Sequence, residues 1–164
     1  FEEATQALEP IPEVQRVDLA QALLFLGHLG VSDFNQFSWF DHPSGPLMMH
    51  ALRFLKSIKA LDDGNRLTEI GRKLLYYPLP PRWGAILALG EKAGAAEVAA
   101  SIAALLSEKD IIERGRGAEV RDLSECDVTY RLGILEERGR GSGNRRAIES
   151  VMQVRDQLRS LVIK

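Results

Sequence analysis

The chain has 164 residues, of which 45% are hydrophobic and 27% charged, a composition that predicts a folded core and excludes an intrinsically disordered protein. Its net charge of -2 favours neither nucleic acid nor an acidic partner, and no stretch approaches the ~20 apolar residues of a membrane span. Cys126 is the only cysteine, which excludes an internal disulfide and a cysteine-based zinc site and predicts a reducing, cytoplasmic location. Because the chain begins with Phe1 rather than Met, we expect it to be a piece of a longer protein.

Charge is unevenly distributed along the sequence. Residues 1–137 carry 14 basic and 21 acidic side chains, whereas residues 138–164 carry 7 basic and 2 acidic side chains. A basic segment on an acidic body predicts one face with a polyanionic partner. A solvated helix surface is the alternative that charge alone leaves open.

The first elements are predicted to be helical. Residues 1–12 contain two prolines among acidic residues and are expected to form an entry linker. Over residues 18–30, four leucines at helical spacing predict a helix that Asp18 caps and Gly30 stops: Leu19, Leu23, Leu26 and Leu29. A short turn capped by Ser32 follows, and residues 47–60 predict a second long helix.

Residues 61–68, with the sequence LDDGNRLT, have turn residues between short apolar ends and predict a small β-hairpin. Two or three helices followed by a short hairpin are typical of a winged helix.

The stretch LTEIGRKLLYYPLPPRWG, residues 67–84, predicts a corner between two helices. Thr68 is the expected N-cap of the first helix, Pro78 ends that helix, and Pro80 and Pro81 occupy the expected start of the next. Gly71 costs roughly 1 kcal/mol in a helix relative to alanine, so we expect a close packing contact at this position.

After the corner the sequence predicts a helical bundle. Two helices rich in alanine and leucine are separated at Gly94, and their small side chains allow close approach. A polar segment is followed by helices over about residues 123–137 and 144–162. The inward side chains expected for the last helix are Ile148, Val151, Val154, Leu158 and Leu161.

Three segments in this order resemble the region that follows the motor domains of DEAH-box helicases, most of all the bacterial HrpB-type branch. They are residues 12–43, residues 60–82 with the pattern LTxxGRxxxxxPLxPR, and residues 101–112 with the sequence SIAALLSEKDII. The resemblance covers about residues 12–159. Matching positions include Thr68, Gly71, Arg72, Pro78, Pro81 and Arg82.

The resemblance implies a mainly α fold, with a winged helix of three helices and a short β-hairpin over residues 13–70 and a helical-bundle ratchet domain over residues 71–164. The six matching positions would then be structural residues between the two domains, with Gly71 bringing its helix close to the bundle and the prolines fixing the angle. Two departures affect the turn and the wing: His42 replaces a proline of the family turn, and Lys59 replaces a glycine before the hairpin.

Catalytic motifs are missing from the sequence. It contains neither the glycine-rich phosphate cradle G-x-x-x-x-G-K-[ST] nor a D-E-A-H string, so no ATP hydrolysis by this piece alone is expected. The three histidines lack the spacing of a metal site, and we expect no catalytic residue, metal or cofactor here. By resemblance, ATP and magnesium would bind the motor domains of the parent protein.

Arginines near the C-terminus are the candidate nucleic-acid-binding residues. Guanidinium groups grip phosphate oxygens bidentately, and the glycines among them keep the loop adaptable. Arg155 and Arg159 are expected to share one helix face because they are four residues apart. The candidates are Arg138, Arg140, Arg145, Arg146, Arg155 and Arg159.

The resemblance therefore implies an accessory module that contacts the backbone of RNA or another single-stranded nucleic acid and couples motor-domain motion to translocation. Its partners would be that strand and the motor domains of its own parent chain, with no membrane. Two alternatives stay open. The chain can be a freestanding winged-helix regulator that reads duplex DNA through residues 47–60, or a helical protein-interaction module.

Overall fold

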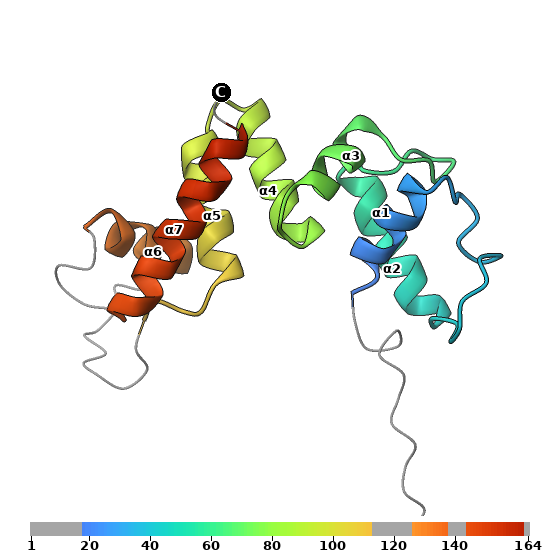
Figure 1. The fold of residues 1–164 in the computed structure, drawn as a ribbon, viewed down its shortest axis with the longest axis horizontal. Helices are drawn as coiled ribbons and strands as arrows, with labels where there is room; N and C mark the ends of the chain where they lie inside the picture. The colour runs from blue at the N-terminus through green and yellow to red at the C-terminus, as the bar shows by residue number, and fades with distance from the viewer. Residues whose placement is uncertain (1–17, 113–125, 138–143, 163–164) are drawn as a thin grey trace, which may run out of the picture. The chain divides into compact units, whose positions relative to one another are not determined.

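The computed structural model describes residues 18–112, 126–137 and 144–162. In these ranges it contains seven helices, α1 to α7, which confirms the predicted mainly α fold (Figure 1). The chain divides into two compact units, residues 1–75 and 76–164. The predicted domain boundary at residue 70 would cut α3 near its start, whereas the observed division falls near its end.

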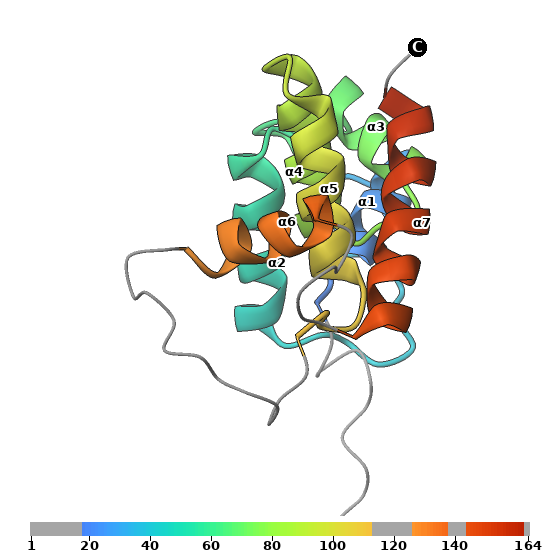
Figure 2. The same ribbon diagram turned by 90° about the vertical axis from the view of Figure 1, so that its left-hand side faces the viewer.

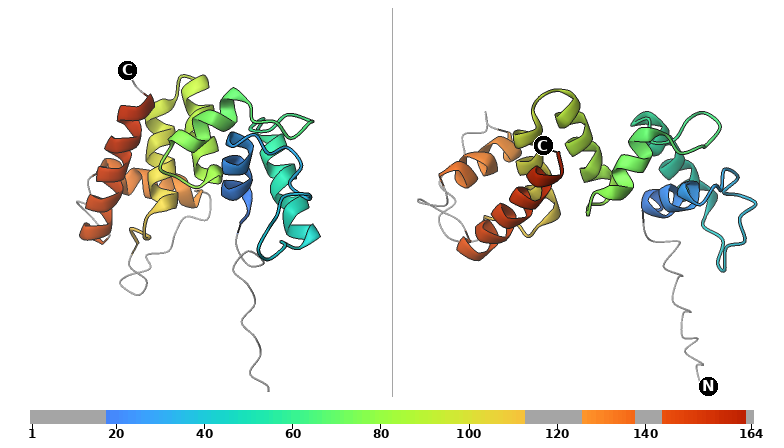
Figure 3. Two further views of the ribbon diagram at one scale, coloured as in Figure 1. Left: turned by 45° about the vertical axis from the view of Figure 1, so that its right-hand side comes forward. Right: turned by 45° about the horizontal axis from the view of Figure 1, so that its top comes forward.

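The first unit contains α1 (Ala20–His28), α2 (Gly45–Ser57) and α3 (Glu69–Tyr76). The helices α1 and α2 lie side by side, as the views in Figure 3 show. Asp18 accepts a hydrogen bond from the Ala20 amide, as predicted for a cap. Leu29, one of the four leucines at helical spacing, lies past the end of α1 and is exposed, while Leu24 is fully buried.

The loop between α1 and α2 makes its turn one residue later than predicted. Asp33, rather than Ser32, accepts hydrogen bonds from the amides of Asn35 and Gln36. The carboxylate reaches the amides two and three residues ahead, which is the geometry that favours Asp at turn starts. Phe34 is buried and anchors the loop in the core of the first unit.

The predicted hairpin is reduced to its smallest form in the described residues. Leu61 and Leu67 form an isolated antiparallel bridge, and no longer strand is present there. Asp62 closes the turn between them, because its amide donates to the Arg66 carbonyl at 3.0 Å and its carboxylate accepts from the Arg66 amide at 2.8 Å. The wing is therefore a tight turn rather than a ribbon.

Thr68 joins this turn to α3. Its hydroxyl donates to the Lys59 carbonyl at 2.6 Å and accepts from the Gly71 amide at 3.1 Å, which confirms the predicted cap. A β-carbon on Gly71 would lie 2.3 Å from the Ala60 carbonyl oxygen and 2.5 Å from the Leu67 side chain. The close contact predicted for Gly71 therefore lies within the first unit, against the end of the hairpin, and not against the bundle as expected.

Three helices end in the same hydrogen-bonded motif. After α1, α2 and α4, one amide bonds back three residues and the next bonds back five residues, which is the Schellman pattern. The residue at the turn has positive φ in each case: Gly30 at 90°, Lys59 at 60° and Gly94 at 72°. Lys59 thus occupies a left-handed position where two other helices of this chain use glycine.

The second unit contains α4 (Pro81–Lys92), α5 (Ala96–Ser107), α6 (Asp127–Glu136) and α7 (Arg145–Val162). The central helix is α5, which contacts the other three; Figure 2 shows α7 beside α5 and α6 lying across it. A β-carbon on Gly90 of α4 would lie 2.1 Å from the Ala99 β-carbon, so the predicted close approach of α4 and α5 is confirmed. The buried face of α5 is Ala99, Ala100, Ala103, Ala104 and Leu105.

The segment after α5 ties the helices of this unit together. Asp110 forms two hydrogen bonds with the guanidinium of Arg131 on α6, at 3.1 and 2.8 Å, and these raise the pKa of Arg131. The Ile111 carbonyl accepts from the Asn144 amide at 2.7 Å, directly before α7. Because Ile111 is buried, this turn fixes where α6 and α7 meet α5.

We predict that Lys59→Gly stabilises the first unit by about 1 kcal/mol, because a left-handed conformation costs a side-chain-bearing residue about 1–2 kcal/mol. The measurement is the free energy of unfolding in urea, followed by NMR signals of the first unit. Lys92→Gly is the matched control, since Lys92 is helical and its replacement costs up to about 1 kcal/mol. A destabilised Lys59→Gly protein would contradict the strain argument.

We predict that Gly71→Ala destabilises the first unit by about 1–3 kcal/mol, because the new methyl group meets a backbone carbonyl that cannot move freely. Gly133→Ala on α6 is the control. No described atom lies within 4 Å of its added β-carbon, so a gain of about 0.5–1 kcal/mol is expected. Hydrogen exchange of the α3 amides reports the first substitution and that of the α6 amides the second, and equal effects of the two substitutions would rule out the packing explanation.

Candidate nucleic-acid interface

The described candidate arginines all lie on α7. Arg145 and Arg146 form its first turn, and Arg155 and Arg159 lie in its second half. Arg138 and Arg140 lie outside the described residues. Asn144 caps the helix by accepting from the Ala147 amide at 3.2 Å, so the start predicted at residue 144 is confirmed.

The first turn of α7 presents its two guanidinium groups to solvent. The Arg145 side chain is 93% exposed and pairs with Glu149, one turn further on, at 3.3 Å. Arg146 is exposed and forms no ion pair with any residue in the described ranges. Exposed pairs at this spacing are weak, so both arginines are available to an incoming phosphate.

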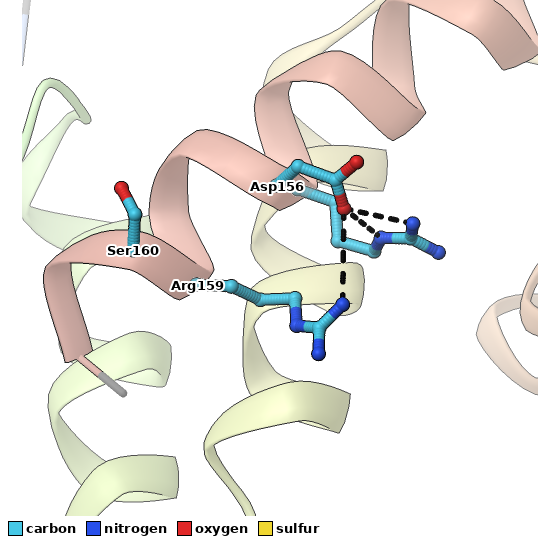
Figure 4. Close-up of a pocket in the computed structure, with 4 residues that line it drawn as sticks. Asp156, Arg159 and Ser160 are labelled. Carbon is cyan, nitrogen blue, oxygen red and sulfur yellow. Dashed lines mark hydrogen bonds and ion pairs between the residues drawn. The ribbon is translucent and has the colours of Figure 1, made fainter. Parts of the chain in front are cut away.

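Arg155 and Arg159 are held by carboxylates instead. Arg155 donates two hydrogen bonds to one oxygen of Asp156, at 3.0 and 2.8 Å. Arg159 donates to Glu97 on α5, and its other terminal nitrogen lies 3.9 Å from the same Asp156 oxygen. Arg155, Asp156, Arg159 and Ser160 line a hollow of about 350 Å³, and Figure 4 shows Arg159 reaching toward Asp156.

The structure therefore brings the arginines together as two pairs and not as one cluster. The rise of an α-helix is about 1.5 Å per residue, which puts the two pairs about 15–20 Å apart along α7. Sequence reasoning correctly placed Arg155 and Arg159 near one another. It missed Asp156, Glu149 and Glu97, although the first two are the only acidic residues of residues 138–164.

The six predicted inter-domain residues take local roles. Thr68 and Gly71 organise the start of α3, and the exposed Arg72 lies 3.4 Å from the Leu67 carbonyl. Pro78 follows the end of α3 and is exposed, while Pro81 is buried at the first position of α4. Arg82 is exposed in the first turn of α4. That these residues fix an angle between the two units stays a prediction.

Most of the aromatic side chains that could stack on bases are occupied by packing. The Trp39 ring nitrogen donates to the Phe34 carbonyl, and its ring meets Phe37 edge to face at 5.1 Å. Tyr77 is buried and donates to Glu91 at 3.2 Å; burial first, and then the Glu91 charge, raise the pKa of Tyr77. Tyr76, which is 80% exposed, is the aromatic side chain that remains accessible near the corner.

The described part of the chain contains neither a metal-ligand group nor a membrane-spanning helix. No group of three or more His, Cys, Asp and Glu side chains is placed there to hold a metal ion. None of its helices combines the length and the apolar character that crossing a bilayer requires.

Comparisons with known proteins match this fold. A family model described as helicase associated domain (HA2), winged-helix, matches residues 51–79. Over 107 residues the chain is 37% identical to the pre-mRNA-splicing factor ATP-dependent RNA helicase prp22 of Schizosaccharomyces pombe, an alignment that covers 65% of this chain and 9% of that protein.

Two crystal structures of Escherichia coli HrpB, one described as a DExH-box NTPase and the other as a DEAH/RHA helicase, are also similar. Their TM-scores are 0.64 and 0.63, with 27% and 28% sequence identity. The matches cover 94% and 93% of this chain but 16% of each HrpB chain, so the chain spans a small part of the proteins it resembles. Together, the family model, the relative and the two structures support a helicase-associated region like the one that DEAH-box helicases carry.

Proposed function

We propose that this chain is the accessory module of an ATP-dependent, HrpB-like RNA helicase, and that it contacts the phosphate backbone of single-stranded nucleic acid. The exposed arginine pair at the start of α7 carries the proposal. Arg145 and Arg146 are solvent-facing cations on a helix fixed by its contacts with α5. Guanidinium groups in this setting bind phosphate without reading bases, so binding is expected to be independent of sequence.

In this proposal the remaining partners are the motor domains of the parent chain. They would bind ATP and magnesium, and this module would pass their motion to the bound strand in the cytoplasm. The similarity to prp22, an ATP-dependent RNA helicase, and the match to HrpB support the assignment. Arg138 and Arg140 belong to the same proposed contact because they precede α7 in the sequence.

The duplex-reading alternative receives less support from α2. Its candidate basic side chains were His50, Arg53, Lys56 and Lys59. Lys56 donates to the Asp63 carbonyl at 3.0 Å, and Lys59 lies beyond the end of the helix in a left-handed conformation. A major-groove reader needs several base-directed side chains on one helix face, and α2 offers few.

We predict that Arg145→Gln/Arg146→Gln weakens binding of a fluorescein-labelled twelve-nucleotide oligouridylate by about tenfold at low salt. Each lost phosphate contact also reduces the slope of log affinity against log salt by ~0.7, so the expected reduction is ~1.4. Fluorescence anisotropy with the 164-residue chain measures both quantities.

Arg53→Gln/Lys56→Gln on α2 is the matched control, because it removes the same charge from the other unit. It should leave oligouridylate affinity within about twofold. If the α2 variant loses affinity and the α7 variant does not, the winged-helix reader replaces the proposed backbone contact. If the wild-type chain binds no single strand at low salt, the nucleic-acid role of this module is wrong.

A further inference from the structure

The hollow on α7 is lined by two arginines whose charge is already neutralised. The two positive charges of Arg155 and Arg159 meet the two negative charges of Asp156 and Glu97. At the start of the same helix, Arg145 pairs with Glu149, and Arg146 forms no ion pair with a described residue. The two arginine pairs of α7 therefore differ in net local charge, although each consists of two arginines.

The two carboxylates hold the arginines in different ways. Glu97 comes from the first turn of α5, 62 residues away in sequence, and its pair with Arg159 joins α5 to α7. Asp156 lies on α7 itself, is 59% exposed, and bonds mainly to its neighbour Arg155. Asp156 therefore neutralises Arg155 without joining two helices, so its removal costs the bundle little.

One guanidinium donor that lines the hollow is unsatisfied among the described residues. The Nε atom of Arg159 is buried and has no hydrogen-bond partner among the described residues. The Ser160 hydroxyl, on the same wall of the hollow, donates only within its own helix, to the Gln157 carbonyl. The hollow, of about 350 Å³, is open and has room for a phosphate group.

We propose that this hollow is a second phosphate site that Asp156 masks, and that a backbone phosphate of a single strand occupies it by displacing the Asp156 carboxylate from Arg155. This inference rests on the proposed function. Exposed ion pairs contribute little to stability. One Asp156 oxygen takes the contacts of both arginines, whereas a backbone phosphate can give one non-bridging oxygen to each guanidinium group. Weakly binding anions do not displace the Asp156 carboxylate. A strand that Arg145 and Arg146 already hold nearby does displace it.

Because Asp156 masks the site, replacing this residue should raise the affinity for a single strand, whereas replacing a residue that contacts the strand would lower it. Asp156→Asn should tighten oligouridylate binding about three- to tenfold at low salt and steepen the salt slope by ~0.7, because one more phosphate is neutralised. Glu136→Gln is the matched control. Glu136 is exposed on α6 with no ion pair in the described ranges, so this change adds the same charge without freeing an arginine and should alter affinity less than about twofold.

Anisotropy of the labelled oligouridylate on the 164-residue chain measures the effect, with circular dichroism melting to confirm folding. Asp156→Ala serves as a second variant, since asparagine can still accept a hydrogen bond. In an Arg155→Gln background, Asp156→Asn should lose its gain and match Glu136→Gln. NMR signals of the Arg155 and Arg159 Nε–H groups, titrated separately with oligouridylate and inorganic phosphate, distinguish a strand phosphate from a free anion.

A gain in Asp156→Asn and Asp156→Ala that depends on Arg155 supports the masked site. Unchanged affinity in both variants, or a gain that persists without Arg155, overturns it while leaving the Arg145/Arg146 contact intact. Nε–H signals that respond to inorganic phosphate and not to oligouridylate overturn the assignment to a strand. Absence of binding in the wild type and in every variant instead removes the proposed function itself.

Discussion

The packing of α5 against its neighbours is the constraint on which the candidate interface depends. Four alanines line its buried face, and α4 approaches so closely at Gly90 that Ala99 leaves no room for a methyl group. Alanine side chains lose no rotamer freedom on burial, so a helix rich in them can be packed on several sides at little entropic cost. Because α7 packs on this helix, its arginines face solvent in a fixed order and Arg159 reaches Glu97.

Much of the local structure was predictable because its causes lie within a few residues. Asp18 and Thr68 act as caps where the sequence placed them, since a cap needs only a short polar side chain and the amides just ahead of it. The turn at Asp33 was placed one residue early because Ser32 and Asp33 are both good turn starters. Both side chains suit a turn start, and the backbone geometry of the folded loop decides which of the two accepts the hydrogen bonds.

Contacts between distant residues were harder to predict. Gly71 signalled a close approach, but its partner is the Ala60 carbonyl at the end of the hairpin, and no pattern in the sequence identifies that atom. Whether an arginine pair is neutralised by carboxylates also depends on contacts between distant residues. Glu97 lies 62 residues before Arg159, and only the packing of α5 on α7 brings their side chains together. Composition predicted a basic segment, and the fold decides which of its arginines are already neutralised.

The shape of the wing bears on the proposed contact with nucleic acid. A single bridge between Leu61 and Leu67 gives no ribbon long enough to follow a groove, and Asp62 uses both its amide and its carboxylate to close the turn. Asn65, at positive φ, donates a hydrogen bond from its side-chain amide to the Ser32 carbonyl. Asp62 and Asn65 thus use these polar groups within the first unit, while Arg66 leaves one exposed guanidinium on the turn. The proposed backbone contact rests on α7 because Arg145 and Arg146 place two exposed guanidinium groups side by side there.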